Sequence, residues 1–373
     1  QLPAATRATL RAEAQDSQRR LVAAVQEFHD WLQTSWLPAA RASTAAVDLP
    51  RGADYYAAML EQGSSTTLSP QQIHRIGLGE VARIDAEMAK VRSDSGFRGS
   101  SVEFRDWLRS DPRFRFADAD AELTAFQALA KRVDPLLPQL FAELPRLPYG
   151  VRPMPAAEGS NAPHYVRGAV DGSRSGWFEA NLNNLAAWPS WTMDALFLHE
   201  AMPGHHLQIA RAQELEQLPM LRRTFSNTAY VEGWGLYAEG LGSSLGLYAD
   251  PYARYGRLAL EAHRACRLVL DTGLHALGWT RDQAIDYLMA HASLERAFAE
   301  AEIDRYLVWP GQATGYKMGE LRILANRDKA RLALGERFDL RHFHNAVLDH
   351  GVLPLSVLDQ VIDDWIADQR RAH

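Results

Sequence analysis

The sequence predicts a mainly helical protein with a small β-hairpin or sheet near residues 150–182. Apolar residues recur three and four positions apart along most of the chain, for example from Leu21 to Leu32, and this spacing is typical of a helix. Helix-start and helix-stop residues bracket several of these stretches. Glycine and proline are instead dense after residue 145, where a long helix would not survive.

The clearest predicted helix starts at Ser69. Ser69 is a suitable N-cap, Pro70 fits the first helical position, and Gln72 can reach back to complete a capping box. The expected buried stripe of this helix is Ile73, Ile76, Ile84, Met88 and Val91. A further helix is expected from Ala121 to Phe141, stopping before Pro145.

Two short strands are expected in the region rich in glycine and proline, at residues 164–168 and 177–182. The Asp-Gly pair at residues 171–172 is a turn signal between them. Helix is expected to return near Thr192 and to dominate to the end of the chain. We therefore expect one mostly helical domain over residues 1–373, with the hairpin inserted into it.

The composition is that of a soluble globular protein, with 47% apolar and 23% charged residues among 373. A net charge of −6 and the lack of Lys/Arg runs argue against a nucleic-acid binder. No apolar run is long enough to span a bilayer. Cys266 is the only cysteine, and its apolar surroundings predict a buried, inert thiol. Because the chain starts at Gln1, we expect a processed product or an expressed fragment.

The stretch H-E-A-M-P-G-H-H at residues 199–206 is the strongest chemical signal in the chain. Imidazole is a good zinc ligand, and a neighbouring carboxylate can take a proton from metal-bound water. The stretch is similar to the H-E-x-x-H helix that holds zinc between two histidines, except that Pro203 and Gly204 precede the second histidine. Apolar residues on both sides predict burial, and buried histidines need partners.

The choice of the second histidine ligand depends on how the helix continues after His199. In a straight helix, His205 points off the face of His199, and His206 returns to it but lies ~10.5 Å along the axis. Pro203 clashes with the carbonyl of residue 199 and Gly204 tolerates unusual backbone geometry, so the helix must distort. We therefore expect His199 and His205 to be ligands. His206 is then a supporting or substrate-facing group, and it remains the alternative ligand.

A third protein ligand is expected, because catalytic zinc usually has three and an open position. Glu232 lies 27 residues after His205, a gap that suits a loop and a second helix packed against the first. Gly233 and Gly235 would permit close approach of the two helices. Glu239 stands on the same helix face, where it either orients a ligand histidine or has no such role.

Three separated motifs resemble one known family. They are H-E-x-x-P-G-H-H-x-Q at residues 199–208, V-E-G-W-x-x-Y-x-E at 231–239 and P-G-Q-x-x-x-Y-x-x-G at 310–319. All three are similar to those of a bacterial domain-of-unknown-function family of zinc peptidases, whose members are often described as lipoproteins. Residues 343–355 resemble the C-terminal tail of that family, and the similarity covers roughly residue 50 to the end.

The resemblance implies a zincin-like, multi-helix fold of the gluzincin kind. Its layout is distantly similar to that of angiotensin-converting-enzyme-type and thermostable-carboxypeptidase-type peptidases. Those enzymes keep a tyrosine from a late segment for the transition state, and Tyr316 stands in the matching place. The resemblance further implies a longer N-terminal region than this chain has, and an exported, periplasmic or lipid-anchored location.

These observations predict a zinc-dependent hydrolase (Zn²⁺) acting on a peptide or small amide. Glu200 is the expected general base, and Tyr316, with His206, is expected to donate hydrogen bonds to the oxyanion. The strand over residues 175–182 is expected to offer its edge to an extended peptide. Two further residues expected to line the cleft are Gln312 and Lys317.

Two other functions remain open on the sequence alone. The same zinc site can cleave a non-peptide amide or a small modified dipeptide. Alternatively, the scaffold can be a catalytically inactive helical binding module without metal. A di-iron carboxylate bundle is excluded, because the paired E-x-x-H helices that it needs are missing.

Overall fold

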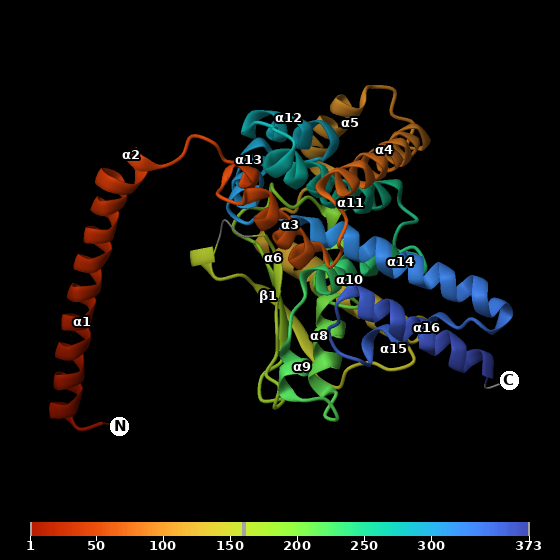
Figure 1. Cartoon of the computed structure of the whole chain (residues 1–373). Helices are drawn as coiled ribbons and strands as arrows, with labels where there is room; N and C mark the ends of the chain where they lie inside the picture. The colour runs from red at the N-terminus through yellow and green to blue at the C-terminus, as the bar shows by residue number, and fades with distance from the viewer. Residues whose placement is uncertain (1, 159–161, 372–373) are drawn as a thin grey trace. The chain divides into compact units, whose positions relative to one another are not determined.

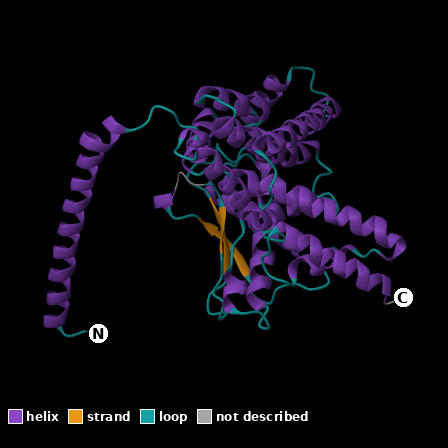
Figure 2. Cartoon of the chain, in the orientation of Figure 1, coloured by secondary structure: helices purple, strands orange, loops and turns teal. Residues whose placement is uncertain are grey.

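The computed structural model describes residues 2–158 and 162–371. The chain divides into two compact units, residues 1–44 and 45–373. Helices make up most of the chain, and a small sheet lies among the helices of the second unit (Figures 1 and 2). The predicted mainly helical fold with a small sheet is confirmed. The single domain expected over residues 1–373 stays a prediction, because two compact units can still fold together as one domain.

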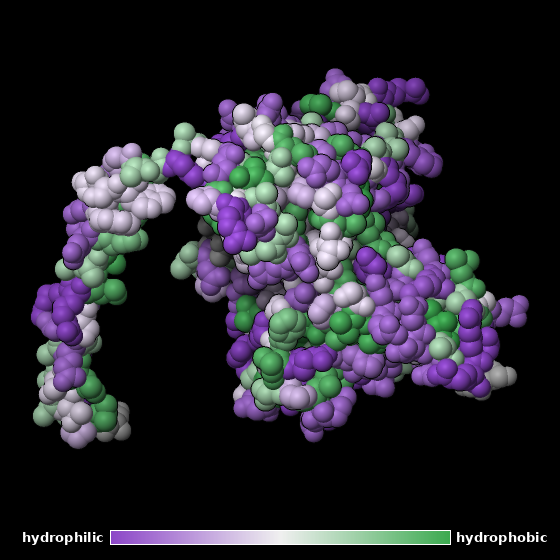
Figure 3. All heavy atoms as spheres, viewed as in Figure 1, coloured by the Kyte–Doolittle hydropathy of each residue, from purple (hydrophilic) through white to green (hydrophobic). Residues whose placement is uncertain are grey.

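The first unit is a run of helix. It consists of α1 (Ala4–Trp31), a π-helical turn (Leu32–Trp36) and α2 (Leu37–Ala39). No described residue of α1 is buried. Figure 3 shows hydrophobic and hydrophilic atoms side by side on the visible surface of this unit.

The second unit contains the remaining helices and the sheet. Its helices are α3 (Gly52–Ser64), α4 (Pro70–Asp94), α5 (Ser101–Ser110), α6 (Ala119–Val133), α7 (Met193–Glu200), α8 (His205–Glu214), α9 (Met220–Thr224), α10 (Thr228–Leu241), α11 (Pro251–Ala276), α12 (Arg281–His291), α13 (Arg296–Val308), α14 (Gly315–Leu334), α15 (Leu340–Leu348) and α16 (Leu355–Arg371). Most residues of α11 are buried, because α4, α7, α12, α13 and α14 all pack against it.

The start of α4 is as predicted. Ser69 Oγ accepts a hydrogen bond from the Gln72 backbone, and the Gln72 side chain accepts one from the Ser69 backbone at 2.8 Å. The predicted stripe faces the core, with Ile76 half-buried and the other four residues buried. Cys266 of α11 is buried too, and this burial raises the pKa of its thiol.

The helix expected from Ala121 to Phe141 is shorter than predicted. α6 ends at Val133, and a 3₁₀ segment over Asp134–Gln139 continues the chain. Pro135 and Pro138 both lie in that segment, and a proline ring removes a donor and obstructs the preceding turn of an α-helix. The two prolines therefore end the helix eight residues before the predicted stop.

The sheet has three strands in the order β1-β3-β2, namely β1 (Tyr149–Pro153), β3 (Gly176–Ala180) and β2 (His164–Val166). β3 pairs antiparallel with β2, as expected for the two predicted strands, and parallel with β1. β1 was not predicted as a separate strand, because Gly150 and Pro153 weaken its pattern. Since β3 has a partner on each side, the prediction that residues 175–182 offer a free edge is wrong.

Candidate metal centre

The two histidines expected as ligands lie on either side of a helix break. α7 ends at Glu200, directly after His199, and α8 begins at His205. The intervening turn contains a cis Met202–Pro203 peptide bond. Both imidazoles are buried, and their ring centroids lie 4.7 Å apart. The predicted distortion at Pro203 therefore brings together two side chains that a straight helix would separate.

Gly204 makes this turn possible. A Cβ atom at this position would lie 1.9 Å from the His199 carbonyl oxygen and 2.3 Å from that of Leu198. Only a residue without a side chain fits so close to the last turn of α7. The turn is held from outside by Trp234 of α10, whose indole N–H donates to the Pro203 carbonyl at 2.9 Å.

Glu232 of α10 completes the group. Its Oε2 lies 3.4 Å from Nε2 of His199 and 3.5 Å from Nε2 of His205. Each of the three residues offers a ligand atom within 4.8 Å of the other two. Ligand atoms bound tetrahedrally to zinc at 2.0–2.2 Å lie about 3.4 Å apart. The donor set therefore fits zinc in number, chemistry and spacing.

Glu239 fixes the orientation of His199. Its Oε1 lies 2.8 Å from Nδ1 of His199, and both side chains are 2% exposed. When Nδ1 donates its proton to this carboxylate, Nε2 is left to face Glu232 and a metal ion. α10 comes close enough for this contact because Gly235 lies against the imidazole, where a Cβ would be 2.6 Å from Cε1 of His199.

The electrostatics of the group favour a positive charge. Burial opposes a proton on His199, but hydrogen bonds to Glu232 and Glu239 outweigh it and raise the pKa of His199 to about 9. Burial also opposes the charge of Glu232, yet His205 and His199 hold the pKa of its carboxyl well below the usual range. Within the described part of the chain, Nδ1 of His205 is buried without a hydrogen-bond partner.

Glu200 and Tyr316 line the same cavity as the three candidate ligands. The cavity has a volume of about 320 Å³, and α7, α8, α10, α11, α13 and α14 all contribute to its wall. Glu200 Oε2 accepts a hydrogen bond from the Tyr165 backbone N–H at 2.9 Å, which holds the carboxylate beside His199. Tyr316, at the start of α14, is half-buried, and its ring lies over the Arg267 guanidinium, 4.1 Å from Cζ.

His206 is not in the cavity wall. Its Nε2 lies 3.0 Å from the Leu147 carbonyl oxygen and its Nδ1 lies 2.9 Å from the Tyr165 hydroxyl. Burial lowers the pKa of His206 to about 4, so the ring is neutral and both nitrogens are engaged. The structure therefore brings Glu200 and Tyr316 to the candidate ligands, whereas it places His206 among structural contacts behind them.

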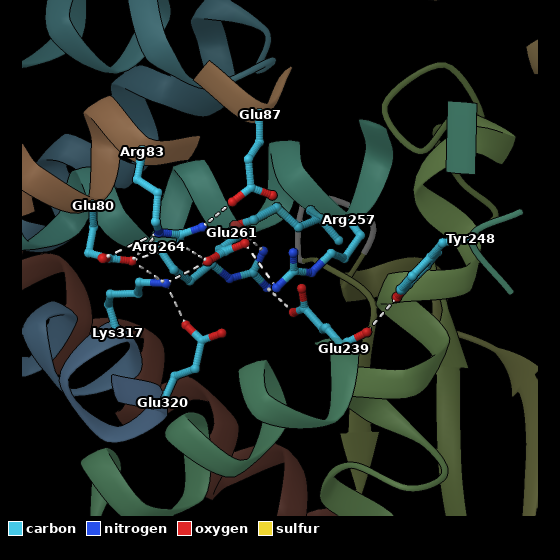
Figure 4. A network of polar contacts seen from close by, with 11 residues as sticks. Glu80, Arg83, Glu87, Glu239, Tyr248, Arg257, Glu261, Arg264, Lys317 and Glu320 are labelled. Carbon is cyan, nitrogen blue, oxygen red and sulfur yellow. Dashed lines mark hydrogen bonds and ion pairs between the residues drawn. The ribbon is translucent and has the colours of Figure 1, made fainter. Parts of the chain in front are cut away.

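The two other residues expected in the cleft also lie elsewhere. Gln312 accepts a hydrogen bond from Arg305 at 2.8 Å and does not line the cavity. Lys317 is fully buried in an ion network, where it lies 2.7 Å from both Glu261 and Glu320 (Figure 4). Both predictions are wrong, because Gln312 lies in a 3₁₀ turn before α14 and Lys317 lies on a face of α14 that points to the core, which the sequence does not show.

Several charged residues in the cavity wall were not predicted. His263, Arg264 and Arg267 come from α11, and Glu302 and Arg305 come from α13. The sequence signal that could have identified the residues on α11 is its pattern, in which ionisable residues interrupt an otherwise apolar helix. Buried charges are costly without partners, so such a pattern predicts a polar interior.

A second group of possible metal ligands consists of Glu158, His164 and Glu179 near the sheet. Arg152 donates two hydrogen bonds to Glu179 Oε1, at 2.8 and 2.5 Å. The charge of Glu179 is thus already compensated by a guanidinium. We therefore take the His199 group as the candidate metal centre.

A family model covers nearly the whole chain. It matches residues 1–362, and its description is "Bacterial protein of unknown function (DUF885)". The chain belongs to this family. A search of the curated proteins finds no match. The predicted membership of a bacterial family of unknown function is confirmed, and the family description carries no activity.

Two solved structures are similar to the chain. One is a candidate lipoprotein from Colwellia psychrerythraea, with 38% identity and a TM-score of 0.88 over 92% of this chain and 60% of that one. The other is a candidate lipoprotein of unknown function from Shewanella oneidensis, with 20% identity and a TM-score of 0.77 over 97% of this chain and 67% of that one. The second likeness shows the fold alone. The chain spans 60% of the length of the first.

No helix in the described part of the chain has both the length and the apolar character needed to cross a bilayer.

Proposed function

We propose that the chain is a zinc-dependent peptidase. The observation that carries this proposal is the convergence of His199, His205 and Glu232, whose ligand atoms face one another in the wall of a cavity. Two imidazoles and one carboxylate with a further position open are the ligand set of catalytic rather than structural zinc. The ligands come from α7, α8 and α10, which places the site on rigid elements.

Zinc, when bound, polarises the scissile carbonyl and lowers the pKa of water towards ~7. Glu200 accepts a proton from the attacking water and delivers it to the leaving nitrogen. The C–N bond breaks, the hydroxyl stays on the carbonyl carbon, and the products are a carboxylic acid and an amine. The hydrogen bond from the Tyr165 backbone supports this role by holding Glu200 at the cavity wall.

Tyr316 is the proposed donor to the carbonyl oxygen as negative charge develops there. Arg305 Nη2 lies 3.5 Å from the Tyr316 hydroxyl oxygen, so that oxygen can accept while its own hydrogen points elsewhere. Hydrogen-bond donors that are already oriented stabilise a developing oxyanion most effectively. We do not assign His206 to this role, because both of its ring nitrogens are engaged outside the cavity.

An extended substrate has a strand edge available in the same wall. β2 pairs with β3 on one side only, and its residues His164 and Tyr165 line the cavity. Peptide backbones are commonly gripped by addition to such an edge. We therefore propose β2, in place of β3, as the edge along which the substrate lies. Because the Tyr165 N–H already donates to Glu200, this edge would bind the substrate through a backbone carbonyl group.

We further propose an exported or lipid-anchored location for the full-length protein. Both similar solved structures are candidate lipoproteins. Fractionation of the source bacterium tests this, since recovery of the protein only in the cytosolic fraction would contradict it.

Replacement of Glu200 by Gln tests the catalytic proposal. The purified chain is expected to contain zinc by elemental analysis and to hydrolyse members of a peptide library. Glu200→Gln should retain the metal and lose about 10²–10⁴-fold in rate, because it removes the base and leaves the ligands in place. Glu300→Gln is the matched control and should be fully active, because Glu300 of α13 pairs with Arg296 and does not line the cavity.

Two histidine variants test the ligand assignment. His205→Ala should lose zinc, whereas His206→Ala should retain it, since only His205 faces Glu232. Loss of metal in His206→Ala alone would refute the assignment. A wild-type chain that binds no zinc would favour the inactive binding module, and a zinc-loaded chain that cleaves small amides but no peptide would favour the second hydrolase.

A further inference from the structure

The part of the cavity wall that α11 and α13 form carries three arginines, and we call it the cationic wall. Arg264 and Arg267 of α11 and Arg305 of α13 all line it. None of these three residues is needed to hold a metal or to accept a proton from water. A buried guanidinium group needs both a compensating charge and an acceptor for each of its N–H groups.

Arg267 is the central member of this wall. It is 5% exposed, its Nε donates to the Tyr306 hydroxyl at 2.9 Å, and its Nη2 donates to Glu302 Oε2 at 2.7 Å. Among the described residues, none accepts a hydrogen bond from its buried Nη1. A buried guanidinium nitrogen without an acceptor is rare in folded proteins, and here it belongs to a residue that lines the cavity.

The three guanidinium groups of the wall have ion pairs with two carboxylates of the cavity region, Glu239 and Glu302. Arg264 Nη2 lies 3.9 Å from Glu239, which is also the partner of His199. Arg267 and Arg305 share one carboxylate, Glu302, at 2.7 and 3.4 Å. Two guanidinium groups therefore face a single negative charge.

His263 does not change this balance. Burial and the neighbouring Arg267 lower the pKa of His263 to about 3, so the imidazole is neutral at physiological pH. Its Nε2 lies 3.2 Å from Glu302 Oε2. The imidazole adds a hydrogen bond to Glu302 without adding charge.

We propose that this cationic wall binds the free C-terminal carboxylate of a peptide, so that the site releases residues from the carboxyl end. The inference rests on the proposed peptidase function. Arg267 stacks on Tyr316 with 4.1 Å between Cζ and the ring centroid, which places the guanidinium beside the residue assigned to the scissile carbonyl. A planar guanidinium binds a carboxylate strongly, and the same charge disfavours a free amino terminus.

A set of three peptides tests the proposal without altering the protein. All share one sequence without basic side chains. The first ends in a free carboxylate, the second ends in an amide, and the third is amidated but carries a glutamate near its end. The free acid is expected to have a kcat/KM about 10- to 100-fold above that of the neutral amide, the range of a charge-assisted hydrogen bond.

The outcomes separate this inference from the proposed function. Equal cleavage of the free acid and the neutral amide would overturn it. Equal cleavage of the free acid and the glutamate peptide would also overturn it. The wall would then recognise an acidic group in general and not the terminal carboxylate. Calorimetric titration of the chain with an N-acetylated dipeptide acid and its amide reads binding alone. If nothing is cleaved but the acid binds more tightly, the proposed hydrolysis fails and the carboxylate site stands.

Variants of the cationic wall provide a second test of the proposal. Arg305 is 31% exposed at its side chain, so Arg305→Gln should fold and should lower the ratio of kcat/KM for the free acid to kcat/KM for the amide about 10-fold. Arg267→Gln should remove the preference altogether. Arg322→Gln, which removes an equivalent charge paired with Asp359 outside the cavity, is the matched control. A preference for the free acid that survives in both wall variants would contradict the proposal.

Discussion

At the scale of single residues, the candidate centre depends on a carboxylate that binds no metal. Glu239 touches His199 on the side away from the ligand atom, and the Tyr248 hydroxyl donates to the Glu239 backbone carbonyl at 2.6 Å. Figure 4 shows Glu239 lying between this tyrosine and Arg264. The negative charge of Glu239 both fixes the ring of His199 and makes its Nε2 a better donor to a cation.

Replacement of Glu239 by Gln is therefore expected to weaken zinc binding by about 10- to 100-fold. The amide can still accept from Nδ1 of His199, but it no longer carries the charge that increases the basicity of the ring. A competitive chelator titration measures the change in Kd, and circular dichroism checks the fold. Glu300→Gln serves again as the control. An unchanged Kd would show that Glu239 has only a packing role.

Residue-scale detail also explains which histidine is a candidate ligand. His205 and His206 are adjacent, yet the first faces Glu232 and the second is held by the Leu147 carbonyl and the Tyr165 hydroxyl. The sequence favoured His205 because Pro203 must interrupt the helix. It could not show that His206 is engaged from behind, since both partners come from distant segments.

At the scale of elements, the site is a junction of helices that approach closely at glycines. A Cβ on Gly204 would collide with the last turn of α7, and a Cβ on Gly319 of α14 would lie 1.8 Å from the Ala229 carbonyl of α10. α10 therefore packs directly against α14, which carries Tyr316. It also contacts the turn between α7 and α8, the two helices that carry the histidines. Small residues at these crossings set the distances on which the metal ligands depend.

Replacement of Gly204 by Ala is expected to destabilise the fold by about 3 kcal/mol or more, because the backbone atoms of Leu198 and His199 cannot move away from the added methyl. His205 should shift with α8, so zinc affinity should fall as well. Urea denaturation measures the first effect and chelator titration the second.

The matched control for this change is Gly79→Ala on an open face of α4. No atom lies within 4 Å of a Cβ there, and the gain in helix propensity should stabilise the chain by about 0.5–1 kcal/mol. Equal changes in the free energy of unfolding for the two substitutions would contradict the conclusion that Gly204 lies in a close-packed turn.

At the scale of the whole second unit, a buried ion network ties together helices from distant parts of the chain. Lys317 of α14 is fully buried and lies 3.0 Å from Glu80 of α4 and 2.7 Å from Glu261 of α11. Figure 4 shows these side chains converging on the Lys317 ammonium group. Burial disfavours the charge of Lys317, but Glu320, Glu261 and Glu80 outweigh this and raise its pKa.

Replacement of Lys317 by Met is expected to destabilise the chain by about 3–5 kcal/mol, because it leaves buried carboxylates without their cation. Lys329→Met on the same helix is the matched control, since Lys329 pairs with Asp363 at the surface and should contribute less than about 1 kcal/mol. Both values come from urea denaturation at neutral pH. Similar losses of unfolding free energy in the two variants would show that the buried network stabilises the chain no more than a surface ion pair does.

The sequence by itself determined the helical class and the start of α4, and it favoured His199, His205 and Glu232 as candidate ligands while His206 stayed open as an alternative. These features depend on short-range physics: apolar spacing, capping chemistry, and the interruption of a helix by Pro203. The prediction for residues 121–141 overlooked Pro135, which ends α6 by a local rule, whereas β1 joined the sheet without a clear strand pattern.

The tertiary structure alone decided the surroundings of the site. It placed His206 behind the cavity, buried Lys317 in the ion network, and brought Arg267 of α11 beside Tyr316 of α14. These outcomes follow from packing between segments far apart in the chain, and a buried charge takes its role from partners that no local pattern specifies. β3 became the central strand for the same reason, because strand order is set by long-range pairing.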